Sequence, residues 1–415
     1  MLYFYKILMK IFYYNNIIKY YLLIITMGIN NINKFLKDKA SRAFFSLPIE
    51  KFTGKKIAID GAHWAFTNMA IARKKVVNKT NVYVNLPNND QIINEWIHMC
   101  LHFILYLLSY NITPIFIFDG KSPIEKDDTK IHRRAAQSNY NDKIVKLTEQ
   151  LKITPTKELA DDLKKNLRNF IHILPENFDM LKDFISGIGV PCIQATGEGE
   201  QLCSSLCIEG IVAGVFSADT DNLVYGCPLL LTSFTSVNAE FECVRLDYIH
   251  KSLNITHKLF VDLCIMSGCD FNTNIYGYGA VKSYNLLKKH DSIDKLPSNL
   301  NITCLNHIRC REIFLYINSS KLVLKSYSNT LIETPTPTTI ETPTTETETT
   351  ETHIFDFNKK CLQNVPYYLG KFGMSELVNK LTAIYVKFDI YDKSENEYIK
   401  NLNLTSPNKY IIYKN

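Results

Sequence analysis

The sequence lacks an uninterrupted apolar run of membrane-spanning length at its N-terminus. Residues 1–26, MLYFYKILMKIFYYNNIIKYYLLIIT, are apolar and rich in tyrosine, but lysines and asparagines interrupt them before the roughly 20 residues of a spanning helix are reached. They also lack the small-residue cleavage site of a secretory signal and the arginine and serine of a transit peptide. Met27 opens MGINNINKFL. We therefore expect no membrane partner, and a functional protein that begins at Met27 or is cut there, with Gly28 as its first residue.

The sequence also lacks a pattern of paired cysteines. Its eleven cysteines are odd in number and scattered, which indicates reduced thiols in the cytosol or nucleus rather than a disulfide framework. Cys304, His307 and Cys310 are spaced like zinc ligands, but no fourth ligand accompanies them. A zinc site is therefore the weaker interpretation of this cluster.

Basic residues are missing from one acidic segment. Residues 329–352, NTLIETPTPTTIETPTTETETTET, carry five glutamates and no lysine or arginine, so the rest of the chain carries +11 although the net charge of the whole chain is +6. A basic body favours a polyanionic partner. The Thr, Glu and Pro composition of the segment predicts a disordered linker.

Past Met27, short apolar runs alternate with helical patterns. The runs predicted as strands are KKIAID (55–60), TPIFIFDG (113–120), PCIQA (191–195) and VAGVFSADTD (212–221). Strands separated by helices predict an α/β fold with a mostly parallel central sheet and helices on both faces. Two polar, basic helical stretches, 130–151 and 157–174, lie between the second and third strands.

Acidic residues follow all four predicted strands. They are Asp60, Asp119, Glu198, Glu200, Asp219 and Asp221. Because functional groups gather beyond the carboxyl ends of strands in an open parallel sheet, we expect these side chains to converge on one edge. A solvated turn with one aspartate as an N-cap would explain ADTD alone, but not all four strand ends.

The carboxylates of such a cluster repel one another, but together they can bind metal ions. Asp219 and Asp221, only one residue apart, raise each other's pKa unless a cation lies between them. Carboxylates without His or Cys are typical ligands of Mg²⁺ or Mn²⁺. Two such ions can activate a water molecule and stabilise the leaving oxygen of a phosphodiester.

The acidic residues lie in motifs that resemble the flap endonuclease/XPG (RAD2-like) family of structure-specific nucleases. The motifs occur in family order between Met27 and His290: MGI, AID, FIFDG, GEGE, ADTDNL, LCIMSGCDF and GYGAVKSYNLL. The resemblance implies a PIN-like nuclease core and a two-metal site formed by seven carboxylates, the six above and Asp270. It implies two Mg²⁺ ions as the cofactor, for which Mn²⁺ can substitute.

Other residues match family positions that contact the substrate. Lys126 and Arg133 lie seven and fourteen residues after Asp119, like the family's arch lysine and arginine that steer and polarise the scissile phosphate, and arginine suits bidentate phosphate contact. A solvated helix face is the alternative for this pair. Phe66 falls where the family places a base-stacking tyrosine, and Arg73 matches an arginine that contacts DNA.

The segment GYGAVKSYNLLKKH resembles the family's helix–two-turn–helix, a DNA-binding element. In the family, Gly277 and Gly279 let backbone amides approach a phosphate of the duplex, and Lys282 supports the contact. The usual proline and lysine are replaced here by Ala280 and Val281, which weakens the expected anchoring of the duplex. A glycine turn between two core helices is a compatible interpretation.

The expected organisation follows from these matches. In chain order it comprises an apolar extension without function (1–26), an N-terminal nuclease region (27–125), a helical arch (126–176), an internal nuclease region (177–265), the helix–two-turn–helix (266–300), a helical continuation (301–328), the linker (329–352) and a C-terminal appendage to which the sequence assigns no role (353–415).

The resemblance implies a Mg²⁺-dependent 5′-flap endonuclease or 5′–3′ exonuclease that cuts DNA at junctions between single strand and duplex, in replication, repair or recombination. Branched or flap DNA is then the partner of a monomer, and no Gln-x-x-Leu-x-x-Phe-Phe box indicates a sliding clamp. The expected location is the nucleus, which would be the host nucleus for a viral chain, or the cytoplasm for a cytoplasmic virus. A catalytically idle DNA-structure-binding subunit and a PIN-type ribonuclease remain alternatives.

Overall fold

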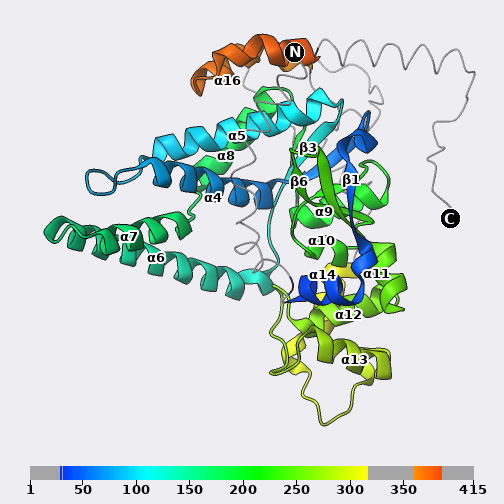
Figure 1. The fold of residues 1–415 in the computed structure, drawn as a ribbon. Helices are drawn as coiled ribbons and strands as arrows, with labels where there is room; N and C mark the ends of the chain where they lie inside the picture. Colours follow the sequence, from blue (N-terminus) through cyan, green and yellow to red (C-terminus); the bar gives the residue numbers. More distant parts are fainter. Residues whose placement is uncertain (1–28, 30, 316–358, 386–415) are drawn as a thin grey trace, which may run out of the picture.

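The computed structural model describes residues 29, 31–315 and 359–385. The predictions for the extension 1–26 and the linker 329–352 lie outside these residues. The described chain folds around one seven-stranded sheet with helices on both faces (Figure 1). This arrangement confirms the predicted α/β class.

The sheet has the strand order β1-β7-β6-β5-β2-β3-β4. The strands are β1 (Phe44–Pro48), β2 (Lys56–Asp60), β3 (Thr113–Phe118), β4 (Cys192–Gln194), β5 (Val215–Phe216), β6 (Leu229–Thr235) and β7 (Glu240–Arg245). β6, β5, β2, β3 and β4 pair in parallel, whereas β7 and β1 add an antiparallel edge. The four predicted strands correspond to β2, β3, β4 and β5, and the sequence analysis did not predict β1, β6 and β7.

Alternate residues of the central strands face two separate cores. Ile57 and Ile59 of β2 pack into one core with Trp96, whereas Ala58 packs into the other with Val215. Side chains alternate along a strand, so a parallel strand covered on both faces is apolar at nearly every position. This is why KIAID reads as a continuous apolar run up to its terminal aspartate.

The helices divide between the two cores. Those of the first core are α4 (Gly61–Lys79), α5 (Asn89–Ser109), α8 (Pro175–Gly187) and α16 (Val365–Lys371), and those of the second are α3 (Ile32–Lys39), α9 (Gly199–Ile208), α10 (Asp221–Val224), α11 (Leu246–Leu253), α12 (His257–Ser267), α13 (Ala280–His290) and α14 (His307–Leu315). Among the described helices only α5 is long and apolar enough to cross a membrane, and most of it is buried inside the molecule.

Two helices project from the sheet as the predicted arch. α6 (Asp127–Ile153) and α7 (Lys157–Asn169) pack against each other and extend away from the strands (Figure 1). They share a small apolar cluster of their own, in which Ile144 and Leu163 pack with Val77 at the end of α4. α7 ends before the predicted limit at residue 174. The rest of α6 is largely solvent-exposed, which leaves its polar face available to a ligand.

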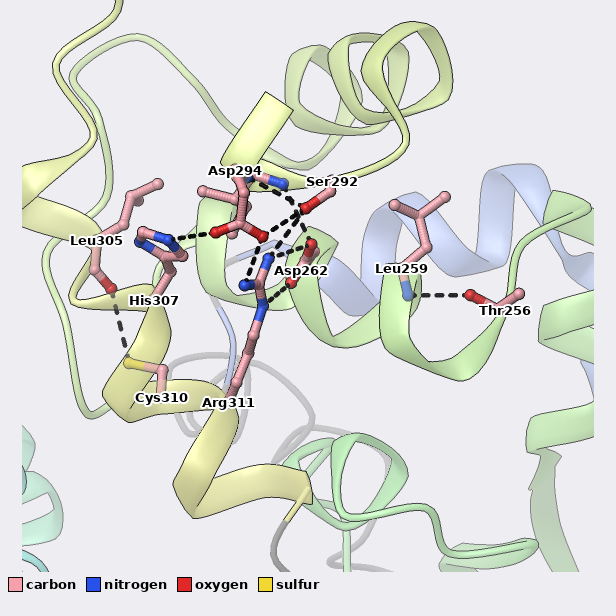
Figure 2. Close-up of polar contacts among 10 residues, drawn as sticks. Thr256, Leu259, Asp262, Ser292, Asp294, Leu305, His307, Cys310 and Arg311 are labelled. Atoms are coloured by element: carbon pink, nitrogen blue, oxygen red, sulfur yellow. Dashed lines mark hydrogen bonds and ion pairs between the residues drawn. The ribbon is translucent and has the colours of Figure 1, made fainter. Parts of the chain in front are cut away.

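A charged network joins α14 to the helix–two-turn–helix region. The buried carboxylate of Asp262 in α12 accepts hydrogen bonds from Arg311 of α14 at 2.6 and 2.7 Å, and Arg311 also donates to Asp294 at 2.8 Å (Figure 2). Asp294 lies 2.9 Å from His307 Nε2. Cys310 is buried beside backbone carbonyls. In the structure, His307 thus hydrogen-bonds to Asp294, whereas Cys310 lies against the carbonyls of Phe271 and Leu305.

The described part of the C-terminal appendage belongs to the first core. η7 (Lys359–Asn364) and α16 pack against α8 (Figure 1). The Phe372 ring meets Phe184 of α8 edge-on with centroids 5.5 Å apart, and its carbonyl lies 2.9 Å from His98 Nε2 in α5. Leu369 is fully buried. The segment thus covers an apolar face that α5 and α8 would otherwise expose.

Candidate active site

The parallel strands bring two of the aspartates to one edge of the sheet. Asp60 ends β2 and caps α4, because its Oδ1 accepts a hydrogen bond from the His63 backbone N–H at 3.0 Å. Asp119 follows β3, and its Oδ1 accepts a bond from the Gly199 N–H at 2.7 Å. A Cβ on Gly199 would lie 2.9 Å from that same oxygen. The glycine between the two glutamates of GEGE therefore leaves room for the close approach of Asp119.

The remaining acids come from the loops after β4 and β5 and after α12. Glu198 precedes α9 with extended backbone, whereas Glu200 lies in its first turn. Asp221 is the first residue of α10, and its N–H donates to Asp219 Oδ1 at 3.0 Å. Asp270 follows α12 in the loop that leads to α13. The seven predicted carboxylates thus lie at the end of β2, in the segments between β3, β4 or β5 and the helices that follow them, in the first turns of α9 and α10, and in the loop after α12.

Burial and repulsion from neighbouring carboxylates raise the pKa values of Asp60, Asp119, Glu200, Asp221 and Asp270. Burial, followed by the charge of Asp119, raises the pKa of Asp60 from 3.8 to about 7. Burial and the neighbouring Asp219 raise the pKa of both Glu200 and Asp221 well above the ordinary range. Such shifts arise when carboxylates share a site of low polarity. The acids predicted from separate strand ends therefore act on one another as one cluster.

The cluster contains polar atoms that the described part of the chain does not satisfy. Glu198 Oε1, Glu200 Oε2 and Asp221 Oδ1 are buried there without a hydrogen-bond partner. A buried and unpaired carboxylate oxygen is costly unless a cation binds it. As the side chains stand, no three His, Cys, Asp or Glu residues in the described ranges already form a metal site. The oxygen donors fit Mg²⁺ or Mn²⁺ in chemistry, and binding requires the side chains to close around the ions.

Two cations from the base of the arch reach the same cluster. The Lys126 ammonium bonds to Glu198 and lies 3.9 Å from Asp270 Oδ2. Arg133 donates from Nη2 to both oxygens of Asp270, at 3.1 and 2.8 Å. Burial alone would lower the pKa of Lys126, but the charges of Glu200 and Glu198 raise it above its ordinary value. The structure thus places both predicted arch residues against the carboxylates, with Arg133 remaining partly exposed on α6.

Phe66 and Arg73 lie on α4 with different surroundings. The Phe66 side chain is 38% exposed and meets Phe178 edge-on, with ring centroids 5.7 Å apart. Arg73 donates from Nε to the Leu167 carbonyl at 2.7 Å, and its guanidinium lies 5.0 Å from the Phe170 ring. Burial lowers the pKa of Arg73 to about 10. Phe66 keeps an open ring for stacking, whereas Arg73 braces the end of the arch, and its predicted DNA contact stays a prediction.

The loop before α13 presents an open backbone. Gly277 has a φ of +78°, and a Cβ on Gly277 or Gly279 would meet nothing within 4 Å. Lys282 lies in the first turn of α13, with its Nζ 5.9 Å from the Tyr278 ring. Tyr276 is 100% exposed beside these glycines, a feature that the sequence analysis did not single out. The loop leaves room for a partner to approach its backbone closely.

Two further polar side chains, which no sequence motif predicts, hydrogen-bond to Asp60 or to the turn after β5. Ser217 donates a hydrogen bond to Asp60 Oδ2 at 2.9 Å. The buried ring of His63 accepts a bond from the Ala218 N–H at 3.3 Å through Nε2. Ser217 lies between β5 and ADTD, where a single serine gives no signal of its own. Only the pairing of β2 with β5 brings it to Asp60.

The fold and the site together define a nuclease core of the PIN-like α/β class. The family model described as the XPG N-terminal domain matches residues 27–140, and the model described as the XPG I-region matches residues 189–270. The two matches contain every predicted metal ligand, since Asp60 and Asp119 fall in the first and the other five in the second.

Named relatives and solved structures agree with these matches. The probable RAD2-like endonuclease 369L of Invertebrate iridescent virus 6 is 30% identical over 335 residues, covering 69% of this chain and 79% of that protein. Flap endonuclease 1 of Cryptosporidium muris is 30% identical over 71% of this chain and 64% of its own length. The catalytic core of Rad2 in complex with DNA substrate has the same fold, with a TM-score of 0.52 at 16% identity, covering 85% of this chain and 100% of that one. The chain belongs to the XPG/RAD2 family of nucleases.

Proposed function

We propose that this protein is a Mg²⁺-dependent endonuclease that cuts a phosphodiester of branched DNA close to the junction between a 5′ single strand and the duplex. One observation carries the proposal. Seven acids gather beside one sheet edge with three buried oxygens unsatisfied by the described residues, and Lys126 and Arg133 face them from the arch. A subunit that only bound DNA would gain nothing from so costly a cluster of charge.

The chemistry follows from the donor set. Two Mg²⁺ ions bound by these carboxylates would supply an activated water and charge stabilisation for the leaving oxygen. The chain itself holds the ligands in place through the His63 and Gly199 N–H groups. On substrate binding, Lys126 and Arg133 exchange their carboxylate partners for oxygens of the scissile phosphate. There they offset the charge that grows on the phosphate in the transition state.

Two exposed features outside the cluster support branched DNA as the substrate. The open backbone at Gly277 and Gly279 can approach a phosphate of a duplex. The exposed ring of Phe66 offers a stacking face for a base next to the cut. Relatives named flap endonuclease and a similar Rad2 structure with DNA point to the same class of substrate. Within the class, we propose a preference for a 5′ flap.

The experiment that tests this function compares four labelled substrates. The full chain is incubated with a 5′-flap duplex, a nicked duplex, a blunt duplex and single-stranded RNA, each with Mg²⁺ or with a chelator. We expect cleavage of the flap near its junction, with Mg²⁺ only. Faster cleavage of the RNA would favour a ribonuclease, and tight binding of the flap without any cleavage would favour a catalytically idle binding subunit. Either result would overturn the proposal.

A further inference from the structure

The Ser217 hydroxyl group hydrogen-bonds both to Asp60, at the end of β2, and to Asp219, shortly after β5. The parallel register pairs Ala58 with Val215 and Ile59 with Phe216, so the next residues along the two strands are Asp60 and Ser217. Ser217 is 1% exposed. Its Oγ lies 2.9 Å from Asp60 Oδ2, and the Asp219 N–H lies 3.1 Å from the same Oγ.

The direction of these hydrogen bonds is fixed by the groups involved. The Asp219 backbone N–H can only donate, so the Ser217 oxygen accepts that bond. The one proton of the hydroxyl is then left for the Asp60 carboxylate, which can only accept when it is ionised. On its other oxygen, Asp60 accepts the His63 N–H at 3.0 Å. Each carboxylate oxygen of Asp60 therefore accepts one hydrogen bond, and the two bonds together fix the orientation of the carboxylate plane.

A second bond ties the same two turns together. The Ala218 N–H donates to His63 Nε2 at 3.3 Å, which links the turn after β5 to the first turn of α4. Asp60 and Asp219 repel each other, so without such links the two turns would relax apart. The Ser217 hydroxyl bonds to both sides of this repelling pair, to the carboxylate of one acid and to the backbone N–H of the other.

From this geometry we propose that Ser217 is a positioning residue that orients Asp60 relative to Asp219 for binding of a divalent cation. The inference rests on the proposed metal-dependent function and adds a residue to it. Hydrogen-bond partners behind a metal ligand orient the ligand before the metal arrives, and their loss typically weakens metal affinity about 10- to 100-fold. Ser217 hydrogen-bonds to the Asp60 carboxylate and to the Asp219 N–H, so we expect its effect on metal binding to pass through Asp60.

The test measures binding of Mn²⁺ to the full chain without DNA, by electron paramagnetic resonance or calorimetry. Ser217→Thr and Ser217→Val have nearly the same shape, but only threonine keeps the hydroxyl. We expect valine to bind Mn²⁺ about 10- to 100-fold more weakly than threonine. Ser205→Ala is the matched control, because Ser205 is also buried but donates only to the Gln201 carbonyl of its own helix at 2.9 Å. It should bind Mn²⁺ like the wild type, and thermal unfolding checks that each variant is folded.

Cleavage of flap DNA gives an independent readout. If Ser217 only positions a ligand, raising the Mn²⁺ concentration should bring the valine variant close to the wild-type rate. If the wild type binds Mn²⁺ and cuts DNA but the threonine and valine variants bind Mn²⁺ equally well, the role of Ser217 alone would be overturned. A wild type that neither binds Mn²⁺ nor cuts DNA would overturn the proposed function as well.

Discussion

Replacing Asp60 by asparagine should stabilise the protein in the absence of metal, although Asp60 is proposed as a ligand. Asp60 is 1% exposed, and burial together with Asp119 raises its pKa from 3.8 to about 7. Between these two pH values the folded state holds a proton that the unfolded state has released, so stability is lost as the pH rises through the pKa of the folded state. Each pKa unit is worth about 1.36 kcal/mol, so Asp60 alone removes about 4 kcal/mol by pH 8.

Asparagine removes the charge but keeps most of the geometry. Its side-chain oxygen can still accept the His63 N–H, and the Ser217 hydroxyl can accept a bond from the amide instead of donating one. In chelator, the variant should match the wild type near pH 4 and should become more stable than it, by about 4 kcal/mol, as the pH rises to 8. The difference between the two proteins removes the contributions of titrating groups that do not interact with Asp60.

Urea unfolding followed by fluorescence measures this difference, because Trp64 and Trp96, the only two tryptophans of the chain, are both buried. Added Mg²⁺ should stabilise the wild type by mass action and leave the variant nearly unchanged, so that the order of stability reverses. A variant that is no more stable than the wild type at pH 8 in chelator would refute the argument. It would show that Asp60 is not forced to hold a charge in an unfavourable site.

Three further predictions test other parts of the structure. Lys126→Ala and Arg133→Ala should each lower the single-turnover rate by ~10²–10³-fold through lost transition-state stabilisation. Lys282→Ala should instead weaken DNA binding and reduce the salt dependence of the affinity by about 1 in slope. Equal losses of DNA affinity in all three variants, with unchanged cleavage rates, would contradict these separate roles. Arg311→Ala leaves its buried carboxylate partner in α12 unpaired, so urea denaturation should show a loss of about 3–5 kcal/mol; a loss below about 1 kcal/mol would mean the pair does not hold α14. Leu369→Ala should cost about 2–5 kcal/mol if the C-terminal segment is part of the core, and an unchanged midpoint would show that it is not.

The strands before the acids could be predicted because a short apolar run leads to a charged residue, directly in β2 and β3 and within a few residues after β4 and β5. Buried parallel strands are apolar on both faces, so Asp60 and Asp119 mark where KIAID and TPIFIF leave the core. The antiparallel edge was missed for the opposite reason. In β7, only part of EFECVR is buried. Its alternation of apolar and polar residues is too short to be distinguished from the helical patterns in the neighbouring sequence.

The contacts between distant segments could not be predicted from any local pattern. Arg311 and Asp262 are 49 residues apart, and neither has a neighbour in sequence that signals an ion pair. Ser217 reaches Asp60 only because β2 and β5 are adjacent in the sheet. The roles of Lys126 and Arg133 were suggested by the family resemblance, and the fold adds that the arch begins directly beside the acids.

Single-turnover cleavage of a 5′-flap DNA by Asp219→Ala, with Mg²⁺ and with DNA binding measured in parallel, tests whether the carboxylate cluster is the site of cleavage. Asp247→Ala is the matched control, because Asp247 is a surface acid paired with Arg245 and lies outside the cluster. We expect Asp219→Ala to abolish cleavage while DNA binding is retained or slightly tightened by the lost negative charge, and we expect Asp247→Ala to cut like the wild type. Cleavage by Asp219→Ala at close to the wild-type rate would show that the carboxylate cluster is not the site of the chemistry.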